Sequence, residues 1–308
     1  MKQTPGADPA PSRTVDEFYA GQAATYDEQY DPARVLTAGS YPANYFRLEI
    51  LKRRLAEHKP GRIIDLGLGE GTPAVTLALA AGAEVRGFDY TAEMVEKARA
   101  NFAAHGLDPA RVIQADVQKP ASYAALLVDG PFDAALCLGV VPHVEDVPAV
   151  LAGIRGCLRP GGRAFVSFRN SVFSLFTMNR YTHAFFLDEL LAGAPEALRE
   201  ACSRDLAGRV AMDKPPLRIR TEDGKVGYDA ILARFHNPLQ APELFARAGF
   251  GGVRLHFYHY HPVPPMLQGA GADPAAFRRA AVDMEVRLAE DWRGHFLCSA
   301  YLVEAVAD

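Results

Sequence analysis

The sequence predicts a doubly wound α/β fold with a mostly parallel sheet of seven strands. Between residues 60 and 170, short β-rich runs alternate with helical patterns, which is typical of a parallel sheet with crossover helices. Glycine and proline mark the turns, as in Arg159-Pro160-Gly161-Gly162 ahead of the fifth run. Two more β-rich runs lie near the end of the chain, where they complete the sheet.

The strands are expected at residues 62–66, 84–89, 111–115, 132–138, 163–168, 253–261 and 295–305. Helices are expected at 45–57, 72–81, 92–105, 122–127, 147–158 and 240–248, with one more opened by Pro274. In that last helix, the residues Phe277, Ala281, Met284, Leu288 and Trp292 are expected to line one face.

The chain divides into four parts. Residues 1–13 are expected to form a flexible tail, and 14–57 a helical segment that packs on the sheet. Residues 58–170 and 235–308 form the α/β domain, and 171–234 form an inserted, mainly helical cap after the fifth strand. The cap is rich in aromatic residues and has a hairpin signal at Asp223-Gly224. Three roles are open for the cap: it forms the wall of an apolar pocket, ordinary core or a dimer face.

Composition narrows the function classes. The 308 residues carry a formal charge of −4 with Lys and Arg scattered among acids, so no nucleic-acid partner is expected. The four cysteines lie far apart and fit free thiols in a reducing compartment. Neither a signal peptide nor a membrane span is evident, which favours a cytoplasmic protein. The sequence leaves a homodimer open.

A glycine-rich turn, Asp65-x-Gly67-x-Gly69-x-Gly71, follows the first predicted strand. Glycines permit a tight turn and close approach of a ligand to the backbone. A dinucleotide site would need the pattern G-x-G-x-x-G, but here the third glycine comes one residue early. The acids Asp65 and Glu70 disfavour a pyrophosphate and favour a cationic sulfonium with an α-amino group. The turn therefore predicts a cradle for a cofactor that carries an amino acid.

Two more acids end the next two strands. Asp89 follows the second strand, where such folds use a carboxylate to accept hydrogen bonds from ribose hydroxyls. Asp116 follows the third strand at the same edge of the sheet and could accept a bond from an adenine amino group.

The glycine turn, Asp89, Asp116, the run 132–143 and the turn 158–163 together resemble the ordered motifs of class I S-adenosylmethionine-dependent methyltransferases, which have a Rossmann-like fold. The resemblance spans about residues 14–170 and resumes at 235–250 and in the last strand. Residues 18–27 are similar to the segment that closes over the cofactor in many small-molecule members, where Tyr26 or Tyr30 would stack over the site. The resemblance implies S-adenosylmethionine as cofactor, held by Tyr26, Asp65, Gly67, Gly69, Gly71, Asp89, Tyr90, Asp116, Val117 and Leu138.

Methyl transfer to a hydroxyl or ammonium needs in-line positioning and a base. His143 follows the fourth strand at the usual mouth of the acceptor pocket and is the candidate base, although a histidine there could also cap a helix or line the pocket. The substrate-binding candidates are Arg169, Asn170, Tyr181, His236 and His259. In His256-Phe-Tyr-His259-Tyr-His261, the alternation of a strand places His259 and His261 on one face, but no third ligand is identifiable, so no metal is expected.

These observations predict methyl transfer to a small-molecule acceptor, such as a metabolite, natural-product intermediate or sugar, at oxygen or nitrogen. Two alternatives stay open: a nicotinamide-dependent oxidoreductase, and a non-catalytic subunit that binds S-adenosylmethionine. Nucleobase methylation is disfavoured, because residues 138–141 read Leu-Gly-Val-Val where such enzymes carry Asn-Pro-Pro-Tyr.

Overall fold

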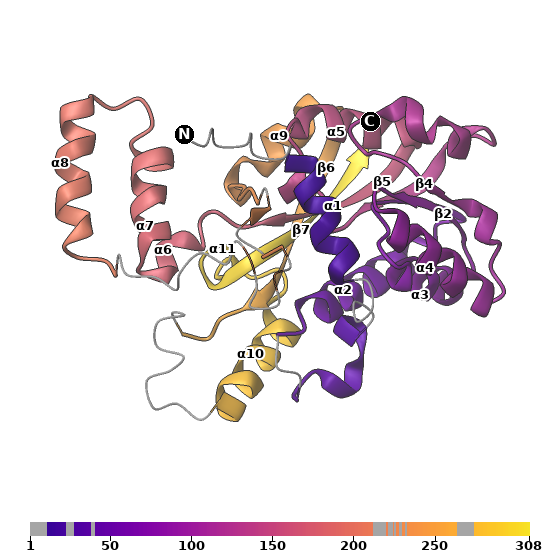
Figure 1. Cartoon of the computed structure of the whole chain (residues 1–308), viewed down its shortest axis with the longest axis horizontal. Helices are drawn as coiled ribbons and strands as arrows, with labels where there is room; N and C mark the ends of the chain where they lie inside the picture. The colour runs from indigo at the N-terminus through magenta and orange to yellow at the C-terminus, as the bar shows by residue number, and fades with distance from the viewer. Residues whose placement is uncertain are drawn as a thin grey trace, which may run out of the picture.

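The computed structural model describes residues 11–22, 28–37, 41–211, 220, 224, 226–227, 230–231, 233–263 and 274–308. Its centre is a seven-stranded sheet in the order β3-β2-β1-β4-β5-β7-β6 (Figure 1). Strand β7 runs antiparallel to both of its neighbours, and the other paired strands are parallel. The predicted doubly wound, mostly parallel, Rossmann-like sheet is confirmed.

The strands are β1 (Arg62–Leu66), β2 (Glu84–Asp89), β3 (Val112–Gln114), β4 (Phe132–Cys137), β5 (Leu158–Arg169), β6 (Phe250–Tyr260) and β7 (Cys298–Ala307). Ile63, Ile64 and Leu66 of β1 have no exposed surface, because helices cover both faces of this central strand.

Two hydrophobic clusters hold helices against the two faces of the sheet. One cluster packs α2 (Ala43–His58), α3 (Thr72–Ala81) and α4 (Ala92–Ala104) on one face. The other packs η4 (Pro120–Leu127), α5 (Val147–Cys157) and α9 (Ala241–Arg247) on the opposite face. Residues of α10 (Pro274–Leu288) contribute to both clusters at the β6 edge.

Short elements complete the chain. The N-terminal helix α1 (Pro11–Gln22) crosses in front of the sheet in Figure 1. The 3₁₀ turns are η2 (Pro32–Arg34), η3 (Pro109–Arg111), η5 (Val141–His143) and η8 (Pro238–Gln240), and α11 (Gly294–Leu297) leads into β7. No helix in the described part of the chain is long and apolar enough to cross a membrane.

A helical insertion follows β5, as predicted. It contains α6 (Ser174–Thr177), α7 (Arg180–Phe185), the π-helix η6 (Phe186–Leu190) and α8 (Glu196–Ala207). Helices α7 and α8 project away from the sheet (Figure 1). Of the expected hairpin, Asp223 lies outside the described residues, whereas Arg220 and Val226 form an antiparallel bridge around Gly224.

Several predicted boundaries were wrong. The expected tail 1–13 lies outside the described residues up to residue 10, and α1 already begins at Pro11. Residues 295–297 belong to α11 instead of the last strand, because the backbone N–H groups there bond to carbonyls three and four residues earlier. Helix α10 ends at Leu288, so Trp292 does not continue its face and is 68% exposed.

The end of β6 is held by a buried carboxylate from α10. Glu285 accepts hydrogen bonds from the Tyr41 hydroxyl (2.7 Å) and from the backbone N–H of Tyr260 (2.7 Å). The neighbouring His259 has a φ of 64°, a conformation that costs about 1–2 kcal/mol for a residue with a Cβ. Burial raises the pKa of Glu285 to about 7, although the hydrogen bond from Tyr41 opposes this shift.

Glu285 therefore makes stability depend on pH. Its folded-state pKa lies above the unfolded value, so its contribution to the unfolding free energy is complete below about pH 4.5 and is lost as the pH rises to 7. We expect a loss on the order of 3 kcal/mol across this window. The Glu285→Gln variant keeps an acceptor oxygen but cannot ionise, so urea unfolding at several pH values should show a smaller loss. Equal losses in the two proteins would contradict this role.

Candidate active site

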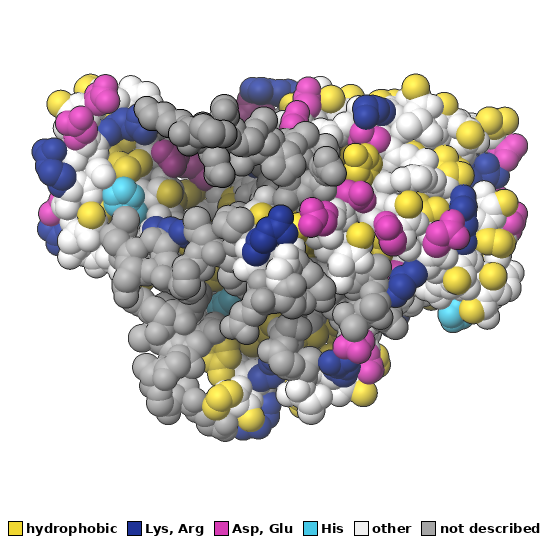
Figure 2. All heavy atoms as spheres, in the orientation of Figure 1, with side chains coloured by type: hydrophobic (Ala, Val, Ile, Leu, Met, Phe, Trp, Pro, Cys, Tyr) yellow, Lys and Arg dark blue, Asp and Glu magenta, His cyan; other side chains and the backbone are white. Residues whose placement is uncertain are grey.

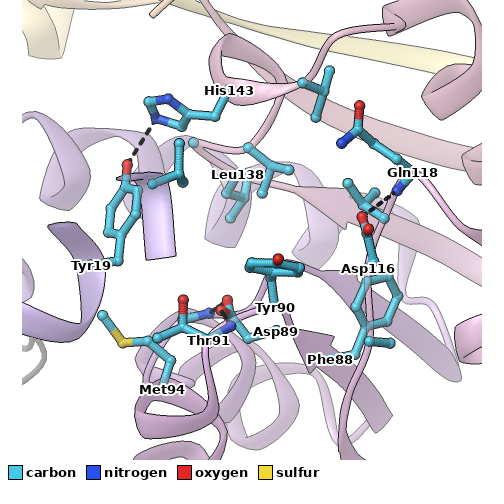
Figure 3. A pocket seen from close by; sticks show the side chains of 18 residues that line it. Tyr19, Phe88, Asp89, Tyr90, Thr91, Met94, Asp116, Gln118, Leu138 and His143 are labelled. Carbon is cyan, nitrogen blue, oxygen red and sulfur yellow. Dashed lines mark hydrogen bonds between the residues drawn. The ribbon is translucent and has the colours of Figure 1, made fainter. Parts of the chain in front are cut away.

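A pocket opens at the carboxyl edge of the sheet, over the ends of the central strands and beneath α1. It is lined from α1 by Val15 and Tyr19, and from the sheet and its loops by Gly67, Gly69, Phe88, Asp89, Tyr90, Met94, Asp116, Val117, Gln118, Leu138, Val140 and His143, among others (Figure 3). Residues of four consecutive β–α turns thus share one cavity with the N-terminal helix.

The glycine turn after β1 runs close to the loop after β4. Gly67 has a φ of 84°, and its N–H donates to the carbonyl of Phe88 (2.8 Å). A Cβ at Gly67 would lie 2.3 Å from Cγ2 of Val140. This position therefore needs glycine for both its conformation and its close approach.

Asp65 carries a buried carboxylate near the end of β1, just before the glycine turn. It is 1% exposed, and within the described residues neither carboxylate oxygen has a hydrogen-bond partner. Burial raises its pKa to about 7, with Arg47 opposing the shift and the negative charges of Asp89 and Glu70 adding to it. A buried carboxylate without partners is costly, so the site is built to receive a donor.

Arg47 of α2 is a site residue that the sequence analysis missed. It is 5% exposed, its charge acts on Asp65, and its Nη2 donates to the Tyr30 hydroxyl (3.4 Å). It also lies next to Gly139, after β4. The signal was present in the sequence: Arg47 and Arg54 stand seven residues apart, in line with Leu51 on the buried face of a helix.

Asp89 ties the glycine turn to the start of α4. Its Oδ2 accepts from the N–H of Gly69 (2.8 Å) and its Oδ1 from the N–H of Thr91 (2.9 Å). Burial raises its pKa, and these backbone hydrogen bonds act against the rise. Two donors leave further lone pairs on the carboxylate for a ligand.

Asp116, the other predicted acid, lies across the pocket from Asp89, with the Tyr90 ring between them in Figure 3. Its Oδ1 accepts from the N–H of Gln118 (2.9 Å), and Lys119 lies 3.0 Å from its Oδ2. The pocket thus brings together Gly67, Gly69, Asp89, Tyr90, Asp116, Val117, Leu138 and His143 of the predicted set, and Asp65 and Gly71 lie in or beside the same turn.

His143 faces Tyr19 at the other end of the pocket. Nε2 of His143 and the hydroxyl of Tyr19 are 2.9 Å apart, and the rings meet edge to face at 5.6 Å (Figure 3). A tyrosine of this segment was predicted to lie over the site, but the predicted residues were Tyr26 and Tyr30. Tyr26 lies outside the described residues, and Tyr30 is buried against Arg47.

The predicted substrate-binding residues do not line this pocket within the described part of the chain. Asn170 is fully buried, and its amide donates to the carbonyls of His295 and Cys298 (2.8 Å each), which holds the end of β5 to β7. Tyr181 is 39% exposed on the cap, 6.1 Å from the Phe235 ring, and the Arg169 guanidinium lies 6.0 Å from the same ring.

The histidines of this set have lowered pKa values. Burial lowers the pKa of His236 to about 4 and that of His259 to about 3, so both are neutral at pH 7. His259 stacks on Tyr41 (4.8 Å) and contacts His261 (4.9 Å), as the strand alternation predicted. The described residues contain no group of three or more His, Cys, Asp or Glu side chains that could hold a metal ion.

The segment with the glycine turn and the next three strands is similar to known proteins. Residues 63–162 match a family model described as a methyltransferase domain. The ubiquinone biosynthesis O-methyltransferase of Xanthomonas axonopodis pv. citri is 33% identical over 144 residues, 47% of this chain and 54% of that protein. The Xylella fastidiosa protein of the same name is 32% identical over 174 residues, 56% of this chain and 62% of that protein. The chain thus matches little more than half the length of these curated relatives.

Two solved structures share the fold. Magnesium protoporphyrin IX methyltransferase from Synechocystis PCC 6803, with bound SAH, superposes with a TM-score of 0.51 at 14% identity, covering 96% of this chain and 100% of that one. Haemonchus contortus phosphoethanolamine N-methyltransferase 2, in complex with S-adenosyl-L-methionine, gives 0.50 at 17% identity, covering 99% and 62%.

The close approach at Gly67 can be measured against Gly106, which has a similar φ of 73° but nothing within 4 Å of an added Cβ. Gly106→Ala should lower the unfolding free energy by about 1–2 kcal/mol, the cost of the conformation alone. Gly67→Ala should cost about 1–3 kcal/mol more, because the methyl group overlaps Val140. Urea denaturation of both variants checks this, and equal losses would show that Gly67 serves conformation only.

Proposed function

We propose that this chain, whose residues 63–162 match a methyltransferase domain, is a class I S-adenosylmethionine-dependent enzyme that transfers a methyl group to oxygen or nitrogen of a small-molecule acceptor. The observation that carries the proposal is the buried carboxylate of Asp65, which has no hydrogen-bond partner among the described residues and stands just before the glycine turn of a pocket that also holds the Tyr19–His143 pair. A cationic amino acid group fits the carboxylate, and proton removal from an acceptor fits the pair.

The polar residues at the glycine turn and in the pocket fit S-adenosylmethionine from its amino acid end to its adenine. Asp65 would hold the α-ammonium group, and Arg47, buried beside it, would hold the α-carboxylate. Asp89 has free lone pairs for ribose hydroxyls, and Asp116 with Val117 lines the end where adenine would lie. When bound, this cofactor supplies an electrophilic methyl group on a positively charged sulfur.

The charges around the glycine turn oppose a nicotinamide dinucleotide. The carboxylates of Asp65, Glu70 and Asp89 make this turn acidic. The charges of Glu70 and Asp89 raise the pKa of Asp65, and the positive charge of Arg47 lowers it. A pyrophosphate would bring more negative charge into a buried, already acidic site. An ammonium group and a sulfonium would instead lower the cost of burying the carboxylates.

The Tyr19–His143 pair supplies the base. With Tyr19 hydrogen-bonded to Nε2, a proton that leaves the acceptor hydroxyl or ammonium passes to the Tyr19 oxygen while the Tyr19 proton moves to His143. The acceptor is then a better nucleophile, and α1 shields the pair from one side. This arrangement serves oxygen and nitrogen acceptors alike.

A small acceptor is supported by the relatives and by the surface. The curated relatives are named ubiquinone biosynthesis O-methyltransferase, and one protein that shares the fold is named phosphoethanolamine N-methyltransferase 2. On the face shown in Figure 2, the described Lys and Arg side chains are interspersed with Asp and Glu, without the broad basic patch that a nucleic acid would need.

Cofactor binding tests the first half of the proposal. By calorimetry, the full chain should bind S-adenosylmethionine, and Asp65→Ala should weaken binding by about 100-fold or more, the loss expected for one partner of a buried ion pair. Glu96→Ala, an exposed acid on α4, is the control and should leave affinity unchanged. Binding of NAD with none of S-adenosylmethionine would overturn the proposal.

Acceptor chemistry tests the second half. With a panel of small phenols, alcohols and amines, release of S-adenosylhomocysteine should identify a substrate for kinetic work. His143→Ala should lower kcat by about 10²–10⁴-fold with little change in cofactor affinity, and Tyr19→Phe should lower it by about 10-fold or more. The exposed His105→Ala serves as control. Full activity of His143→Ala, at every pH, would remove the base assignment and leave cofactor binding intact.

A further inference from the structure

Helix α1 carries a carboxylate toward the pocket that the proposed chemistry does not yet use. Val15 and Tyr19, one turn apart, line the pocket, and Asp16 lies directly after Val15. Oδ1 of Asp16 is buried, and no described residue gives it a hydrogen bond. Its neighbour Glu17 points the other way, because it is exposed and lies 3.9 Å from Arg220 of the insertion.

Asp16 shares its surroundings with Asp89. The negative charge of Asp16 acts on Asp89 and adds to the rise in its pKa. Asp89 in turn is held in place by the N–H groups of Gly69 and Thr91 and cannot turn away without losing them. With α1 in this position the two carboxylates repel each other, and this repulsion disfavours the packing of α1 over the pocket.

A ligand that donates hydrogen bonds to both carboxylates would turn this repulsion into a net attraction between α1 and the pocket. Two adjacent hydroxyl groups do so, since each can donate to a different carboxylate, and hydrogen bonds to charged acceptors are stronger than neutral ones. The Asp89 position is where the proposed cofactor places its ribose diol.

We propose that Asp16 is a second carboxylate acceptor for the cofactor ribose, so that bound cofactor stabilises α1 in its position over the pocket. The inference rests on the proposed cofactor. Tyr19 follows Asp16 by one turn of the same helix, so the same stabilisation holds the Tyr19 hydroxyl beside His143 (Figure 3). Cofactor binding thereby stabilises the proton-accepting pair.

A matched pair of variants tests the contact. Asp16→Ala should weaken binding of S-adenosylhomocysteine by about 10-fold, and Glu17→Ala, which removes the same charge from the neighbouring position, should change it less than two-fold. Equal effects of the two variants, or no effect of Asp16→Ala, would overturn the proposal.

Ligand analogues locate the contact on the ribose. Titrations with 2′-deoxy- and 3′-deoxy-S-adenosylhomocysteine complete a double-mutant cycle with Asp16→Ala. For one of the two analogues, the variant should bind as well as the wild-type chain, because the hydroxyl that Asp16 contacts is already missing. A full 10-fold loss with both analogues would show that Asp16 does not contact the ribose.

Hydrogen exchange reports on how strongly the cofactor product stabilises α1 over the pocket. S-adenosylhomocysteine should slow exchange of the α1 backbone amides in the wild-type chain and in Glu17→Ala, but much less in Asp16→Ala at saturating ligand. Equal protection in all three would contradict the coupling. If the wild-type chain does not bind S-adenosylhomocysteine, the proposed function itself fails; if it binds and Asp16→Ala is unchanged, only this inference fails.

Discussion

The buried carboxylate of Asp65 is the constraint on which the site depends. It stands at the end of the central strand β1, where helices cover both faces of the sheet and little water reaches it. Removing a charge from water is costly unless a partner compensates, and burial accordingly raises the pKa of Asp65 to about 7. Two neighbouring elements offset this cost. The glycine turn leaves space for a ligand beside Asp65, and α2 supplies the positively charged Arg47.

Helix α2 connects the pocket to the opposite side of the fold. Two turns after Arg47, Arg54 donates from Nε and Nη2 to the buried Glu304 of β7 (2.6 and 3.1 Å). Burial acts to raise the pKa of Glu304, but hydrogen bonds from His256 and Arg54 hold it well below its usual range. The carboxylate therefore stays ionised and fixes α2 along its length. The position of Arg47 beside Asp65 is thus set by a contact at the far end of the same helix.

The sequence was sufficient to predict the sheet, its helices and most of the polar groups at its carboxyl edge. Strand β1 and the glycine turn are encoded locally, by consecutive apolar residues and by glycines at fixed spacing, so Asp65, Asp89 and Asp116 could be assigned. Strand boundaries near Leu297 were missed because hydrogen bonds across one turn of helix decide them. No apolar or polar pattern distinguishes that turn from the strand it joins.

Contacts between distant segments were beyond prediction. Tyr19 meets His143 only after α1 has packed over the pocket, and the charge of Arg47 acts on Asp65 only after α2 has packed on the sheet. Asn170 was expected to bind substrate because it leaves β5 at the carboxyl edge of the sheet, yet its amide donates to the carbonyls of His295 and Cys298, where β7 begins. Which polar group remains free for a ligand depends on tertiary packing, and sequence spacing does not report it.

The central claim is that Asp65 receives the cationic amino acid group of the cofactor. Burial raises the pKa of Asp65 to about 7, so the free protein carries part of a proton there at pH 7, and an ammonium partner would displace it. Calorimetric titration with S-adenosylmethionine at pH 7, in buffers of different ionisation enthalpy, measures this proton directly. The account predicts that the wild-type chain releases more protons on binding than Asp65→Asn does. Identical proton release by the two proteins, with the wild-type chain binding tightly, would contradict it.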